Sequence, residues 1–193
     1  MTKGARTKQL MLDAATDLFQ RQGLHATGVN QVLVESGAPR GSLYFHFPGG
    51  KQQLAAEAVE SAGRHVHELI EEVLRRARGV EGAVAEVVEL FAALLESSDF
   101  RSGCPIATVA LEANAESPDL CSACAGAYES WLGTLGERFV HWGVDREDAP
   151  ELATTALSML EGALLLARVQ RDASALRTVG NQLTRMLVAA GAR

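Results

Sequence analysis

Closely spaced glycine and proline residues divide the N-terminal part of the chain into three short helical segments. Apolar residues recur every three or four positions before Gly23, which predicts a helix with one buried face that ends at this glycine. A second helix starts after Thr27, which can cap it, and ends at Gly37. Pro39 suits the first turn of a third helix, which runs to about His46. Two short helices joined by a tight turn and braced by a preceding helix predict a helix-turn-helix head.

The helical period continues from Lys51 to the C-terminus. Lys51 opens a long fourth helix, and further helices are predicted at about 80–96, 105–114, 118–141, 148–170 and 173–190. Only 5% of the residues are aromatic and β-branched runs are scarce, so helix propensity exceeds strand propensity almost everywhere. Because 47% of the residues are hydrophobic, the chain can bury a sizeable core. We therefore predict an all-α fold of about nine helices, divided into a three-helix head at residues 1–50 and a helical body at residues 51–193.

Charge is distributed unevenly along the chain, whose formal net charge is −6. Residues 1–51 hold six basic and three acidic side chains, a net charge of +3, and they include every lysine. The remaining residues hold 12 basic and 21 acidic side chains, a net charge of −9. A basic head on an acidic body attracts phosphate at one end and repels it elsewhere. This distribution favours a nucleic-acid partner for the head.

Residues 22–54, QGLHATGVNQVLVESGAPRGSLYFHFPGGKQQL, resemble the signature of the TetR family of transcriptional regulators. The segment GCPIATVALEA, residues 103–113, is similar to the LmrA/YxaF-like subgroup, whose members are implicated in sensing small lipophilic compounds. The resemblance implies a DNA-binding domain at residues 1–50 and a ligand-binding and dimerisation domain at residues 51–193. It further implies a repressor that binds a palindromic operator on double-stranded DNA as a homodimer and is released by a small, lipophilic effector.

In the family, the third helix enters the major groove of DNA. Arg40 is then the candidate to reach a guanine edge or a phosphate, and Gly41 lets the helix come close. By resemblance Tyr44 and His46 bind the phosphate backbone, although a half-buried pair on a short helix is the alternative. The predicted DNA-contacting set is Thr27, Arg40, Gly41, Ser42, Tyr44, His46 and Lys51.

Other residues of the head have structural or open roles. Leu43 and Phe47 are expected to pack inside the head. Pro39 stands where the family commonly has a small hydroxyl residue, so a phosphate contact from that position is in doubt. Asn30 and Gln31 could reach DNA or could be ordinary exposed helix residues.

The middle helices are expected to enclose an effector cavity. A carboxylate on an apolar helix, such as that of Glu112, must be paired, solvated or available to a ligand, so the expected effector is an apolar or cationic small molecule. The aliphatic candidates could equally be plain core residues. The predicted ligand-binding residues are Phe91, Leu95, Ile106, Val109, Glu112, Tyr128 and Trp131, with Asn114 as a further polar group. By family resemblance the last two helices form the dimer interface, through Leu157, Glu161, Leu164, Arg168 and Leu183.

The remaining motifs argue against other classes of protein. No hydrolase, zinc-protease or nucleotide-binding motif is found, so we predict that the protein is not an enzyme. No cofactor or metal site is predicted, because the five histidines lack ligand spacing and Cys121-x-x-Cys124 has only Cys104 as a further thiol. We expect the cysteines to be reduced core residues, with thiol redox sensing as the alternative.

The alternatives to a DNA-binding repressor and the cellular location of the protein can also be judged from the sequence. A protein-interaction module would leave the basic head unexplained, and an activator is as compatible with DNA affinity as a repressor. No secretory signal opens the chain, and the apolar stretch at residues 163–167 is far shorter than the roughly 20 residues of a membrane span. We therefore expect a cytoplasmic protein with no membrane partner.

Overall fold

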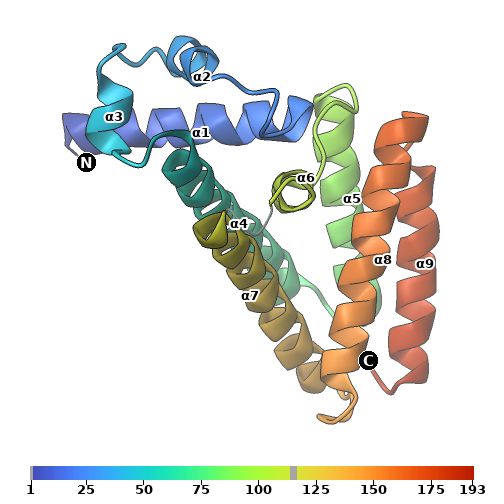
Figure 1. Cartoon of the computed structure of the whole chain (residues 1–193). Coiled ribbons are helices and arrows are strands. Elements are labelled where there is room, and N and C mark those ends of the chain that lie inside the picture. Colours follow the sequence, from blue (N-terminus) through green and yellow to red (C-terminus); the bar gives the residue numbers. More distant parts are fainter. Residues whose placement is uncertain (1, 114–116) are drawn as a thin grey trace. The chain divides into compact units, whose positions relative to one another are not determined.

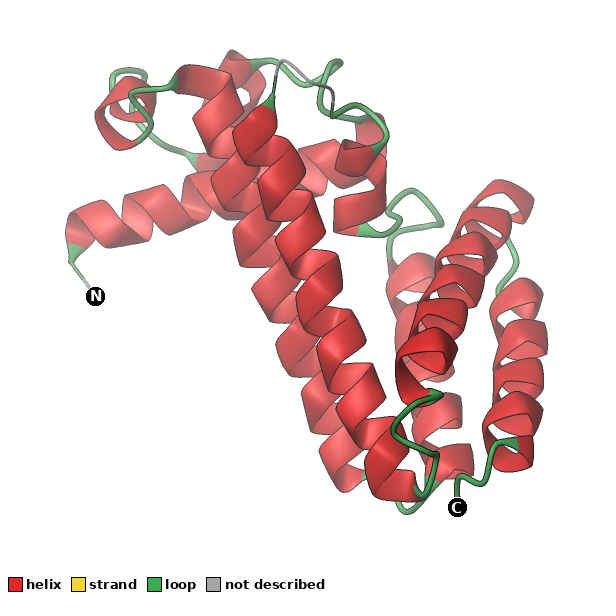
Figure 2. Cartoon of the chain, turned by 60° about the horizontal axis from the view of Figure 1, so that its bottom comes forward, coloured by secondary structure: helices red, strands yellow, loops and turns green. Residues whose placement is uncertain are grey.

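The computed structural model describes residues 2–113 and 117–193, in which every regular element is a helix (Figures 1 and 2). The helices are α1 (Lys3–Gln22), α2 (Val29–Ser36), α3 (Ser42–His46), α4 (Gly50–Arg76), α5 (Val80–Ser97), α6 (Pro105–Ala110), α7 (Pro118–Trp142), α8 (Ala149–Gln170) and α9 (Ser174–Ala189). The predicted all-α fold is confirmed. Most predicted boundaries agree within one or two residues, and the exceptions are the start of α3 and the end of α6.

The helices form two compact units. Unit 1 consists of Met1–His65 and Cys104–Ala127, and unit 2 consists of Val66–Gly103 and Tyr128–Arg193. The long helices α4 and α7 each contribute to both units. The first part of α4, all of α6 and the start of α7 therefore belong to the same compact unit as the first three helices, while the predicted functional division after residue 50 stays a prediction.

Unit 1 is built around the buried face of α1, which packs against α2 and α6. Leu43 and Phe47 are fully buried in this unit, as predicted. Burying a large apolar side chain contributes about 1.5–3 kcal/mol, so these two residues anchor α3 firmly. The other buried side chains of α1, α2 and α4 in this core include Met11, Ala15, Leu18, Phe19, Val32, Leu33 and Leu54.

The turns of the head differ from the prediction in two places. Helix α3 begins at Ser42 rather than Pro39, because the Ser42 N–H donates to the Pro39 carbonyl at 2.9 Å and closes a turn before the helix. The N-cap of α2 is Gly28 rather than Thr27, whose hydroxyl instead donates to the Gly23 carbonyl at 2.7 Å. Gly23 ends α1 as predicted, with a φ of +86° that an L side chain rarely adopts.

Unit 2 is a helical bundle in which α9 packs against both α5 and α8. Gly180 allows the close approach of α9 to α5, since a Cβ at this position would lie 2.6 Å from Cγ2 of Val88. Phe139 stacks on Trp142 with 6.1 Å between the ring centroids. The buried core includes Ile70, Leu74, Val80, Ala83, Leu135, Phe139, Trp142, Ala153, Ala156, Leu183 and Leu187.

Helix α8 is more apolar than the short stretch at residues 163–167 suggests. By length and composition alone this 22-residue helix could cross a membrane, with a mean hydropathy of 1.4 over its most apolar window. A core helix of a soluble protein passes the same test, so a single such helix is weak evidence for a membrane span. Only 28% of that window is buried in the described chain, which leaves apolar surface to be explained.

Candidate nucleic-acid interface

Helix α3 presents one face to the core and the opposite face to solvent. Leu43 and Phe47 are four residues apart, a spacing that places both on the buried face. Tyr44 and Phe45 are exposed, and His46 is half-buried with its ring edge-on to that of Phe45 at 4.9 Å. The exposed face of α3 therefore carries two phenyl-type rings and an imidazole.

Phe45 is a functional candidate that sequence reasoning missed. Its side chain is 78% exposed, although it is purely apolar. The signal was available in the sequence, because inward-facing Leu43 and Phe47 force the residue between them outward. An exposed phenylalanine on a recognition helix suits apolar contact with the methyl group of thymine.

Arg40 lies in the turn before α3 at the edge of a hollow of about 520 Å³. Its guanidinium makes no hydrogen bond or ion pair with the part of the chain that the structure describes. The other lining residues come from α2 and the α2–α3 turn: Asn30, Leu33, Val34, Gly37 and Ala38. Arg40 is the one cation among these residues, so it is available to an incoming base edge or phosphate.

Two other basic residues of the head are already paired. Arg21 forms ion pairs with Asp17 at 2.6 Å and Glu35 at 3.0 Å. Lys8 pairs with Glu57 at 2.6 Å. These contacts reduce the positive charge that Arg21 and Lys8 offer to DNA, which leaves Arg40 with a larger share.

Lys51 and Thr27 both attach to the turn between α1 and α2. The Lys51 ammonium donates to the His25 carbonyl at 3.4 Å. Thr27 is only 1% exposed and supports the turn through the Gly23 carbonyl, so its hydroxyl is not offered to solvent. Gly41 is exposed, and Ser42 is half-buried with its hydroxyl donating to the Pro39 carbonyl at 2.6 Å.

Glu112, predicted as an effector-binding residue, contacts the head. Its carboxylate accepts the backbone N–H groups of Leu24 at 3.1 Å and His25 at 2.6 Å and also contacts Nδ1 of His25. Burial raises the pKa of Glu112, but the hydrogen bonds from His25 and Leu24 outweigh it and hold the pKa below its usual value. The carboxylate therefore remains ionised at neutral pH.

The other predicted effector residues are divided between the two units. Ile106 and Val109 are buried in unit 1, while Asn114 lies outside the described residues. In unit 2, Leu95 and Trp131 are buried, and Phe91 and Tyr128 are half-buried. Tyr128 packs edge-on against Trp131, with 5.5 Å between the ring centroids.

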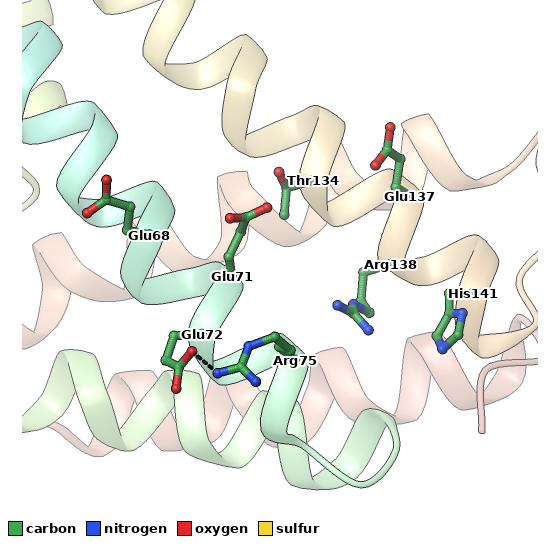
Figure 3. Close-up of a pocket in the computed structure, with 8 residues that line it drawn as sticks. All are labelled: Glu68, Glu71, Glu72, Arg75, Thr134, Glu137, Arg138 and His141. Atoms are coloured by element: carbon green, nitrogen blue, oxygen red, sulfur yellow. Dashed lines mark hydrogen bonds and ion pairs between the residues drawn. The ribbon is translucent and has the colours of Figure 1, made fainter.

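Two hollows of different chemistry can be described within unit 2. The first is polar, has a volume of about 510 Å³, and is lined by side chains of α4 and α7 that include an ion pair between Glu72 and Arg75 (Figure 3). The second has a volume of about 40 Å³ and only apolar lining, from residues such as Leu74, Phe139 and Trp142. None of the four predicted effector residues in unit 2 lines either of these hollows.

The predicted dimer residues lie at different depths. Leu164 and Leu183 are buried within unit 2, whereas Leu157, Glu161 and Arg168 are half-buried. The large apolar side chains that α8 and α9 leave exposed are Leu165, Leu166, Val169 and Val188. Sequence reasoning did not single out Leu165, Leu166 and Val188, because helical period alone does not show which apolar stripe the same chain covers.

None of the three cysteines, all of which lie in the described residues, forms a disulfide. Cys121 is exposed, and Cys124 is buried, which raises the pKa of its thiol. Cys104 precedes α6 and its sulfur accepts the N–H of Ala107 at 3.4 Å.

A short recognition helix anchored by two buried residues, an exposed aromatic face and an available arginine define a helix-turn-helix DNA-binding regulator. Residues 11–58 match the model of bacterial regulatory proteins of the tetR family. Residues 80–182 match the model of the C-terminal domain of LmrA/YxaF-like transcriptional regulators. The chain belongs to the TetR family and, within it, to the LmrA/YxaF-like regulators.

Similar proteins match this chain over more than nine-tenths of its length. It is 41% identical over 187 residues to the HTH-type transcriptional regulator Rv0196 of Mycobacterium tuberculosis, with 94% of each chain covered. It is 35% identical over 182 residues to the regulator LmrA of Bacillus subtilis, with 94% of this chain and 96% of LmrA covered. The crystal structure of the regulatory protein TetR from Rhodobacter sphaeroides shares the fold, with a TM-score of 0.83, 20% identity, and coverage of 92% and 96%. The protein is thus a DNA-binding transcriptional regulator and not an enzyme, as predicted.

Proposed function

We propose that the protein is a repressor that binds a palindromic operator as a homodimer and dissociates when a small, lipophilic effector binds. The observation that supports DNA reading by α3 most directly is its outward aromatic face beside Arg40, whose guanidinium has no partner among the described residues. In this proposal α3 enters the major groove, and Arg40 and Phe45 contact base edges. Tyr44, His46 and Lys51 bind phosphates and fix the register.

The dimer is proposed to form through α8 and α9. Leu165, Leu166 and Val169 on α8 and Val188 on α9 are exposed, although water contact with large apolar side chains is unfavourable. Gly162 on α8 has open space in place of a side chain, so a helix of a second copy can approach closely. Two heads must then reach successive major grooves, about 34–36 Å or a multiple apart.

The effector is proposed to act by changing the separation of the two heads. The predicted effector residues remain candidates, and the mostly apolar side chains among them favour a lipophilic compound. A ligand that binds more tightly to a conformation in which the two heads no longer match successive grooves weakens DNA binding without touching α3. A cytoplasmic location is part of the same proposal, because the operator lies on chromosomal DNA.

Binding of the purified protein to fragments from its own genomic neighbourhood tests the proposal. We expect one dimer per palindromic site and an affinity that falls as the salt concentration rises. Arg40→Ala should reduce the preference for one base at one operator position by about 1–3 kcal/mol. Tyr44→Phe should weaken binding to all DNA sequences by a similar factor. Failure to retard any fragment at low ionic strength would contradict operator binding, and indifference to every lipophilic compound tried would contradict induction.

A further inference from the structure

The turn between α1 and α2 receives a carboxylate from a distant part of the chain. The N–H groups of Leu24 and His25 both donate to Glu112, which lies 87–88 residues further along the chain in the same compact unit. Hydrogen bonds from N–H groups to an ionised carboxylate are stronger than those between neutral groups. Glu112 therefore fixes two consecutive backbone amides of this turn.

The fit between the turn and the carboxylate is close. A Cβ at Gly23 would lie 2.1 Å from Oε1 of Glu112, so the carboxylate occupies the space that any other residue type would fill. Leu24 is buried beside it, and Glu112 is itself only partly exposed. This contact is a built feature of unit 1 and not a chance surface pair.

The same turn supports residues proposed to meet DNA. The carbonyl of His25, one of the two residues whose N–H groups Glu112 binds, accepts the Lys51 ammonium at 3.4 Å. Thr27 closes the other end of the turn through the Gly23 carbonyl. The turn ends at Gly28, the N-cap of α2. The position of Lys51 and the start of α2 thus depend on the turn that Glu112 holds.

We propose that Glu112 is a positioning residue for DNA binding: through the Leu24 and His25 amides it fixes the α1–α2 turn and, through that turn, Lys51. The inference rests on the proposed contact of Lys51 with phosphate. Glu112 follows α6, which packs on α1, so a shift of α6 would reach the DNA-binding surface through this carboxylate. The predicted role of Glu112 in effector binding stays a separate prediction.

The direction in which one substitution changes DNA affinity distinguishes this role from a simple effect of charge. Removing an acidic group from a DNA-binding unit should raise DNA affinity, because the acid repels phosphate. Removing Glu112 should instead lower it, because the turn is released. Glu60 provides the matched control, since it is exposed on α4 in the same unit and its ion pair is a long one with Arg64 at 4.0 Å.

The experiment compares full-length Glu112→Gln and Glu60→Gln on a retarded fragment over a range of salt concentrations. We expect Glu60→Gln to bind at least as tightly as wild type and Glu112→Gln to bind about tenfold more weakly, the scale of a lost hydrogen bond to a charged group. The slope of log affinity against log salt concentration should be smaller for Glu112→Gln than for wild type, by about the amount expected for one phosphate contact. Adding Lys51→Gln to the Glu112→Gln protein should reduce DNA affinity by a smaller factor than Lys51→Gln does in the wild-type protein.

Hydrogen exchange supplies the independent measurement. The amides of Leu24 and His25 should exchange faster in Glu112→Gln, while those in the middle of α1 should not change. If Glu112→Ala is poorly folded, Glu112→Gln and Glu112→Asp keep the comparison. Equal binding by Glu112→Gln and Glu60→Gln, with unchanged exchange at Leu24 and His25, overturns the inference. Wild-type protein that binds no fragment overturns operator binding itself, so the two failures are distinguishable.

Discussion

The carboxylate of Glu112 fills the space that a side chain on Gly23 would need: a Cβ on Gly23 would lie 2.1 Å from the carboxylate oxygen Oε1. Gly23 also has a φ of +86°, so the position excludes other residues for two separate reasons. The clash involves a side chain that is held by two backbone amides and cannot move away freely.

Gly23→Ala should therefore destabilise the protein by about 1–3 kcal/mol, the range for strained backbone and overpacked sites. Denaturant unfolding followed by circular dichroism measures the effect. Gly126→Ala on α7 is the control, because its Cβ would meet nothing within 4 Å and a helical glycine gains stability on replacement by alanine. Equal stability of Gly23→Ala and wild type would contradict this prediction and would show that the turn and the Glu112 side chain rearrange at little cost.

The Glu112 contact should also give stability a specific pH dependence. The folded pKa of Glu112 lies below its ordinary value of 4.5, so its contribution is fully present above that value and is lost as the pH falls through the folded pKa. The free energy of unfolding of wild type should exceed that of Glu112→Gln by a constant amount at neutral pH, and the difference should shrink below about pH 4.5. A difference that grows on acidification would contradict the assignment.

Phe45 should read thymine through its 5-methyl group. Phe45→Ala should weaken specific binding by about 1 kcal/mol, the scale of burying one methyl group, without loss of stability, because the ring is 78% exposed. Replacing operator thymines by deoxyuracil one at a time should reproduce the loss at one position in wild type and add nothing in Phe45→Ala. Leu94→Ala, which truncates an exposed apolar side chain of α5, should bind like wild type. If deoxyuracil has no effect at any position, Phe45 has another role.

Val169 should lie in the dimer interface. Val169→Asp places a charge on the exposed apolar surface of α8 and should shift the protein toward monomer in sedimentation experiments. Operator affinity should fall with it, because one head alone has half of the contacts. Ala93→Asp, on an exposed position of α5, should leave both properties unchanged. A Val169→Asp protein that remains dimeric would place the interface elsewhere.

Local sequence signals were sufficient for most of the fold. Glycines at positions 23 and 37 end their helices with positive φ, as their placement after apolar periods predicted. Leu43 and Phe47 are buried as predicted, because a four-residue spacing places them on one helical face. The start of α3 was predicted three residues early, since Pro39 is compatible with both a first helical turn and a preceding β-turn.

The candidate site was less accessible to sequence reasoning, because its details depend on contacts between distant residues. Nothing near Glu112 in the sequence indicates that its carboxylate binds amides 87–88 residues away. The burial of Thr27 and Leu183 likewise depends on neighbours from other helices. Period and composition show that a residue is apolar or polar, and only the packed chain shows what covers it.

The course of the chain through unit 1 limits how regulators of this type can be recombined. Residues 104–127 belong to the same compact unit as the first 65 residues, although they lie in the middle of the sequence. A chimera that grafts residues 1–50 onto the body of another regulator would separate the Leu24 and His25 amides from the carboxylate that binds them. Such a graft should recover full operator affinity only when the recipient supplies an acidic residue where Glu112 stands.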